Sequence, residues 1–310
     1  MPRILALLLI SGFLAAPTLA PAQGLPVGVT LLPQAWLARQ VGGDLVQVQV
    51  LVGSGQDPHQ YQASPRQVAT LSQARLYFRS GAPLEDFILP KLQQQNPQMV
   101  VVDTLAGIKL LAAPEHHHGE AAHPGEARHE SEATGEHHEG EAAGEHPGEM
   151  RDFHVWLSPR LAARQAATMA QALEQADPVH AAEYQANLAK LTARLSQLDA
   201  TLTRLLAPYK GRAFLVFHPA FGYFAQAYGL RQLAMEVEGK EPTARELASI
   251  LDRARQERVT AIFVEPQFSQ KSAATLAQAL GVRVVTVDPL SPNYESNLES
   301  LGRTMAHTLR

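Results

Sequence analysis

The 310-residue chain contains no cysteine, which excludes disulfides and thiolate metal sites. Aromatic residues make up only 6% of it, and beyond the amino terminus no apolar run is long enough to cross a membrane. Its 26 basic and 30 acidic residues give a formal charge of −4, without the concentrated basic face that nucleic-acid binding requires. The sequence also lacks the His-Glu-x-x-His motif of zinc peptidases. We therefore expect a protein that does not bind nucleic acid and depends on its apolar core for stability.

The amino terminus has the composition of a secretory signal. Arg3 precedes an apolar stretch over residues 4–16, and Ala20-Pro21-Ala22 is a small-x-small cleavage motif. We expect residues 1–22 to be a signal peptide that is cleaved after Ala22, with the mature protein in the periplasm. Because no cysteine is present to carry a lipid, we expect a soluble protein without an anchor.

A histidine- and glutamate-rich segment spans residues 115–149. It contains ten glutamates, one arginine and almost no large apolar side chain, so it should form a disordered loop. Eight of the chain's thirteen histidines lie in it: His116, His117, His118, His123, His129, His137, His138 and His146. Such a mixture of imidazoles and carboxylates indicates a secondary, weak transition-metal site. The alternative is a solvated acidic linker.

On either side of this segment, short β-branched runs alternate with helical patterns. This alternation predicts an α/β fold with two lobes, each a mostly parallel sheet covered by helices. We expect strands near residues 27–31, 45–52, 74–78 and 99–102, and then near 213–217, 261–264 and 282–287. The expected domains are an N-terminal metal-binding lobe over residues 23–176, a connector over 177–208 and a C-terminal lobe over 209–310.

The connector is predicted from helical spacing alone. Asp177-Pro178 is a favourable start for a helix. Apolar residues then recur at helical spacing: Tyr184, Leu188, Leu191, Leu195, Leu198, Leu202 and Leu205. We interpret this segment as one long rigid helix that joins the two lobes. The alternative is a coiled-coil stripe that forms a dimer.

Four residues outside the loop are candidate metal ligands. His59 follows one predicted strand, while His218 and Asp288 stand at the carboxyl ends of two others. His154 precedes a predicted helix. Ligand groups gather at the carboxyl edge of open α/β sheets, and three histidines with one aspartate make a complete tetrahedral zinc set. Each residue alone is more often a turn or cap residue than a ligand. We expect the two remaining histidines, His180 and His307, to be exposed.

The motifs around these residues are distinctive when taken together. They are Asp57-Pro58-His59-Gln60-Tyr61, Asp152-x-His154-Val155-Trp156-Leu157-Ser158-Pro159, Phe217-His218-Pro219-Ala220-Phe221-Gly222-Tyr223, Phe263-x-Glu265-Pro266-Gln267-Phe268 and Asp288-Pro289-Leu290. In these motifs the chain resembles the cluster A-I periplasmic metal-binding proteins of zinc and manganese ABC importers, in particular the ZnuA-like zinc-binding members. The resemblance covers essentially the whole mature chain. A His-rich acidic insertion between the first two motifs is also typical of the zinc-binding members.

The resemblance implies two α/β lobes joined by one long helix, with His59, His154, His218 and Asp288 as metal ligands. A water or another carboxylate could take the place of Asp288. It implies high-affinity capture of Zn²⁺ as the transported ligand by a monomer, and delivery to the membrane permease of a zinc ABC transporter. The alternatives are a manganese-binding relative, or a periplasmic zinc buffer or metallochaperone. A zinc hydrolase would need a positioned base. Glu265 is the nearest candidate, but its place before Pro266 indicates a structural role, so we do not expect an enzyme.

Overall fold

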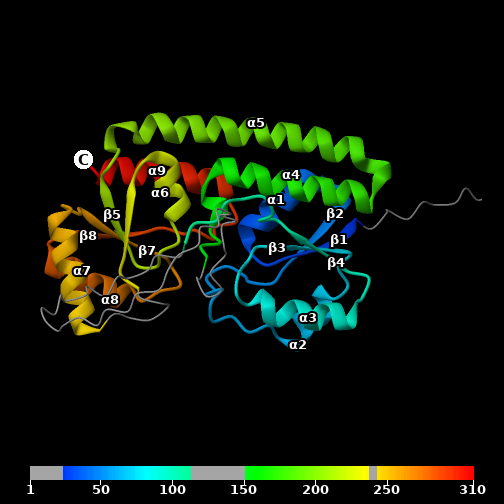
Figure 1. Cartoon of the computed structure of the whole chain (residues 1–310), viewed down its shortest axis with the longest axis horizontal. Helices are drawn as coiled ribbons and strands as arrows, with labels where there is room; N and C mark the ends of the chain where they lie inside the picture. The colour runs from blue at the N-terminus through cyan, green and yellow to red at the C-terminus, as the bar shows by residue number, and fades with distance from the viewer. Residues whose placement is uncertain (1–23, 113–150, 237–242) are drawn as a thin grey trace, which may run out of the picture.

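The computed structural model describes residues 24–112, 151–236 and 243–310. The expected signal peptide and the whole His-rich segment lie outside the described residues. Within the described residues, two lobes lie side by side beneath one long helix (Figure 1).

The first lobe is built on a parallel sheet in the order β2-β1-β3-β4. Its strands are β1 (Leu25–Val29), β2 (Val46–Val50), β3 (Leu76–Arg79) and β4 (Val100–Asp103). Its helices are α1 (Leu32–Gly42), α2 (Pro65–Leu71), α3 (Glu85–Gln95) and α4 (Pro159–Ala176). In Figure 1, α2 and α3 lie on one side of this sheet, and α1 and α4 lie on the side that faces the long helix. The predicted strands are all present, with ends shifted by one or two residues.

The second lobe repeats this plan with the sheet order β6-β5-β7-β8, again all parallel. Its strands are β5 (Ala213–Val216), β6 (Arg231–Ala234), β7 (Ala261–Val264) and β8 (Arg283–Thr286). Its helices are α6 (Gly222–Tyr228), α7 (Ala244–Gln256), α8 (Gln270–Leu280) and α9 (Tyr294–Thr308). The sequence did not predict β6, which forms one edge of the sheet.

The long helix α5 (Ala181–Leu206) has 26 residues, a length of roughly 40 Å at 1.5 Å per residue. It runs across the top of both lobes (Figure 1). Its apolar stripe is buried within the same chain at Tyr184, Leu191, Leu195, Leu198, Leu202 and Leu206. Because this stripe packs inside the molecule, the coiled-coil alternative is wrong, and the helix acts as the connector.

Polar contacts fix α5 to a helix of each lobe. The Asp199 carboxylate on α5 accepts a 2.8 Å bond from Arg160 Nε on α4 and a 3.3 Å bond from Tyr228 Oη on α6. Gly302 of α9 lies so close to α5 that a Cβ at this position would stand 2.3 Å from Leu202 Cδ2. One apolar core also extends from the first lobe, past α5, into the second. These contacts restrict rotation of one lobe against the other.

Helix starts were predicted with mixed success. Thr243 caps α7, and Glu246 completes a capping box with it. The Asp177 carboxylate, by contrast, does not cap the backbone. It accepts a 2.8 Å bond from Tyr184 Oη and lies 2.7 Å from His180 Nδ1. A short 3₁₀ turn over Pro178–His180 therefore comes before α5.

No helix in the described ranges combines the length and the apolarity needed to cross a membrane.

Candidate metal site

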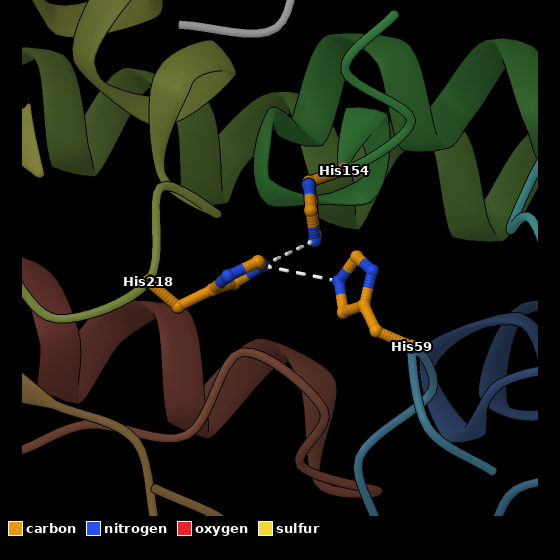
Figure 2. A group of neighbouring side chains, drawn as sticks. All are labelled: His59, His154 and His218. Carbon is orange, nitrogen blue, oxygen red and sulfur yellow. Dashed lines mark hydrogen bonds between the residues drawn. The ribbon is translucent and has the colours of Figure 1, made fainter. Parts of the chain in front are cut away.

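Three histidines from distant parts of the chain converge where the lobes meet. His59 comes from the loop after β2, His154 from the segment before α4, and His218 from the turn after β5. His218 Nε2 lies 3.3 Å from His59 Nε2 and 3.4 Å from His154 Nε2. Figure 2 shows the three rings turned toward this common point. One nitrogen of each ring falls within 4.8 Å of the others, so the rings could hold one metal ion.

Local turns position two of these rings. The Asp57 carboxylate accepts a 2.9 Å bond from the backbone N–H of His59, which forms a turn around Pro58. Asp152 Oδ1 accepts a 2.8 Å bond from the backbone N–H of His154 and lies 2.7 Å from His154 Nδ1. Asp152 therefore fixes both the backbone and the ring of His154.

The third ring is held by a residue that the sequence analysis missed. Glu236 follows β6, is 7% exposed, and places Oε2 at 2.8 Å from His218 Nδ1. A neutral imidazole whose Nδ1–H donates to a carboxylate has its lone pair on Nε2. Asp152 and Glu236 thus select the tautomers that present Nε2 to the common point.

The three rings differ in their affinity for a proton. Burial, with help from the neighbouring His218 and His154, lowers the pKa of His59 to about 3. Burial also lowers the pKa of His154, although Asp152 opposes this effect. At His218 burial again acts to lower the pKa, but the hydrogen bond and charge of Glu236 outweigh it and raise the pKa. Of the three rings, His218 therefore holds a proton most strongly, and a metal ion would have to displace that proton.

The walls of the site are largely apolar. They include Phe153, Trp156, Phe268, Pro289 and Leu290, and the space between them is about 10 Å³, enough for one water-sized sphere. His154 is 8% exposed and His218 is 7% exposed, whereas His59 keeps an exposed edge. The arrangement suits one small ion that enters past His59, not an extended organic ligand.

Asp288 does not join the cluster in this structure. It follows β8, and its Oδ1 accepts a 2.9 Å bond from the backbone N–H of Leu290. Its ligand atoms are outside the group that the three histidines form among the described residues. Burial raises the pKa of this carboxyl group. In this structure the Asp288 carboxylate caps the turn that follows β8, which was the alternative to a metal ligand in the sequence analysis.

The remaining candidates lie elsewhere. His180 pairs with Asp177 at the start of α5, and His307 lies in the last turn of α9; both residues are exposed as expected. The eight histidines of the insertion lie outside the described residues. Glu265 is fully buried behind His218 instead of lining the site, and burial raises its pKa to about 8.

Residues 27–310 match the family described as "ZnuA: Zinc-uptake complex component A periplasmic". The chain belongs to this family.

Individual members of the ZnuA family agree with this assignment. The chain is 29% identical over 268 residues to the Yersinia pestis high-affinity zinc uptake system protein ZnuA, which covers 85% of this chain and 82% of that protein. A crystal structure of a ZnuA is 36% identical, with a TM-score of 0.78 over 93% of this chain and 100% of that one. A 138–173 deletion mutant of ZnuA with zinc bound matches equally well, at 36% identity and a TM-score of 0.78 over 92% of this chain and 98% of that one.

As a ZnuA-family member, the chain is a zinc-binding substrate-binding protein that captures zinc and delivers it to an ABC importer. The family description implies a periplasmic or extracellular location. The three-histidine cluster lies at the seam between the lobes. There Trp156 Nε1 donates a 2.8 Å bond to the Pro289 carbonyl, and Tyr223 Oη donates a 2.7 Å bond to the Asp152 carbonyl. A shift between the lobes would therefore act directly on the segment that carries His154.

Proposed function

We propose that His59, His154 and His218 bind the zinc ion that this protein captures, each through Nε2. The observation that supports this is the convergence of three Nε2 atoms within 4.8 Å at the lobe seam. Two of the rings are already oriented by carboxylates before any ion binds. A preformed site of this kind suits selective capture at low zinc concentration.

Three imidazole nitrogens favour zinc over manganese, which prefers oxygen ligands. A manganese-binding relative is therefore the less favoured alternative. The fourth zinc ligand is a water, or Asp288 after its carboxylate leaves the Leu290 N–H. Competition between zinc and manganese for the same site tests the preference for zinc, and manganese binding as tight as zinc binding would refute it.

The proposed role is capture and release without catalysis. An open fourth position would also suit a hydrolase, but Glu265 is buried away from the space between the histidines. The protein then acts as a monomer that docks on the permease of a zinc ABC transporter. Failure to bind that membrane complex would favour the alternative of a zinc buffer or metallochaperone.

The His-rich segment over residues 115–149 is proposed to be a weaker zinc collector beside this site. Its flanking residues support that placement: Ala112 pairs with Arg151, and the Asp152 N–H donates a 2.9 Å bond to the Leu111 carbonyl. The described residues on either side of the insertion therefore lie next to Asp152, the residue that holds His154. We also propose that residues 1–22 are the export signal, which sequencing the amino terminus of the secreted protein would test.

Calorimetric zinc titration at neutral pH tests the proposal, with the mature chain compared with a variant lacking residues 115–149. We expect the shortened protein to keep one tight site and to lose only weaker ones. A His154→Ala variant of the shortened protein should lose the tight site. If the tight site disappears with the insertion instead, the three histidines are not the capture site.

A further inference from the structure

Glu236 is a buried carboxylate that contacts Nδ1 of the proposed ligand His218, the ring nitrogen that faces away from the other two histidines. Its Oε2 lies 2.8 Å from His218 Nδ1, and its side chain is 8% exposed. A carboxylate in such a place costs free energy unless it is paired. The His218 ring provides that pairing and leaves Nε2 free to face the other two histidines.

The backbone makes this pair rigid. The N–H of Met235 donates a 2.9 Å bond to the Val216 carbonyl, and the N–H of Glu236 donates a 2.9 Å bond to the Phe217 carbonyl. These bonds extend the pairing of β5 and β6 up to the residue before His218. Glu236 follows β6, and His218 follows the strand paired with it, β5. The carboxylate therefore has a fixed position relative to the ring.

The other carboxylate of the site has a mixed role. Asp152 bonds the His154 ring, but it also accepts the His154 backbone N–H. Replacing Asp152 would disturb the loop as well as the ring. Glu236 reaches its histidine from another strand, so the ring can be tested without changing the turn that carries it.

We propose that Glu236 is a positioning residue for zinc capture, which fixes the His218 tautomer and supplies negative charge behind the ion. This inference rests on the proposed role of His218 as a ligand. Carboxylate partners of metal-binding histidines orient the ring and make it a stronger donor, and their loss typically weakens metal binding by 10- to 100-fold. Glu236 thus raises zinc affinity without touching the ion.

The test compares Glu236→Gln and Glu236→Leu in the full chain. Zinc affinity is measured against a competing chelator, so that only the tightest site is followed. The Gln variant keeps an acceptor for Nδ1 but removes the charge, so we expect a loss of several-fold. The Leu variant removes both, so we expect a loss of roughly 10- to 100-fold. Glu257→Gln is the control, because Glu257 pairs with Arg231 at the far end of β6 and is remote from the site.

Two further measurements separate positioning from a purely structural role. Thermal unfolding of the metal-free Leu variant reports the loss of stability that comes from leaving the buried His218 Nδ1–H without its acceptor. Co²⁺ bound to the Leu variant should give a visible absorption spectrum different from that of the wild type, and the Gln variant should keep the wild-type spectrum.

Wild-type affinity in the Leu variant would overturn the inference while leaving the proposed site intact. A loss in both variants that only follows lowered thermal stability, with unchanged Co²⁺ spectra, would also overturn it. Absence of any tight site in the wild type would instead refute the proposed function.

Discussion

The unequal pKa values of the three histidines predict how many protons zinc displaces. His59 and His154 have lowered pKa values, so they are mostly neutral near neutral pH and contribute few protons. His218 has a raised pKa, so at pH 6 it is mostly protonated and must lose its proton when zinc binds. We therefore expect about one proton to be released per zinc at pH 6. Three ordinary imidazoles with pKa values of about 6.5 would each be roughly three-quarters protonated and would release more than two.

The same reasoning sets the pH dependence of zinc affinity. Below the raised pKa of His218, each unit of pH should cost one tenfold step in affinity, about 1.4 kcal/mol. Between pH 6 and pH 5 this amounts to a loss of about tenfold. Three independent ordinary histidines would lose roughly 500-fold over that range. In both cases zinc affinity falls as the pH falls, because acid protonates the nitrogen that zinc needs.

The assay is isothermal titration calorimetry at pH 6 in two buffers with different ionisation enthalpies, which gives the number of protons released. It needs the variant lacking residues 115–149, because the histidines of the insertion would add their own protons. That deletion leaves Ala113, Pro114 and Met150 to join the ends, which already pair through Ala112 and Arg151. Release of two or more protons per zinc would refute the assignment of the single proton to His218.

Three further predictions concern individual side chains. Asp288→Asn should lower zinc affinity by less than tenfold, because the Asp288 carboxylate accepts the backbone N–H of Leu290 instead of facing the histidines. His218→Ala should cause a much larger loss, and calorimetric zinc titration of both variants compares the two losses. Asp199→Ala should lower stability by about 1–3 kcal/mol, since it leaves the buried Tyr228 hydroxyl without its acceptor, and denaturant unfolding measures this. Gly302→Ala should also lower the stability of the protein by about 1–3 kcal/mol, because the new Cβ would lie 2.3 Å from the Leu202 side chain of α5. Thermal unfolding measures this loss, and zinc affinity is measured as a control.

The sequence predicted the parts of the site that have a local signal. His59 follows an alternating β-branched strand, and His218 follows a strand that is apolar throughout. His154 precedes a helix that starts with proline. Parallel sheets bring strand ends to one edge, so the convergence of these residues could be expected before the structure was known. The apolar spacing of α5 was equally visible, and burial of its stripe within the chain decided against a dimer.

Two features could not be predicted because their causes lie far away in the sequence. The strand β6 has four residues, Arg-Gln-Leu-Ala, with only Leu233 buried, so no hydrophobic alternation distinguishes it. Without β6, nothing marks Glu236 among the other glutamates of the chain. The role of Asp288 was ambiguous for a different reason. An aspartate after a strand can bind a metal or cap the next turn, and only the position of the Leu290 N–H distinguishes the two.

The position of the site at the seam has a consequence for zinc release. His59 and His154 belong to the first lobe, whereas His218 and its partner Glu236 belong to the second. Because the paired strands hold His218 and Glu236 together, a tilt of the second lobe would move them as one unit away from the other two rings. A Zn–N bond is about 2.0–2.1 Å long, so a displacement of roughly 1 Å breaks it. The contacts of Asp199 and Gly302 with neighbouring helices oppose wide opening, yet they permit a shift this small. A rigid connector is therefore compatible with release, provided that the transporter supplies the energy for a small tilt.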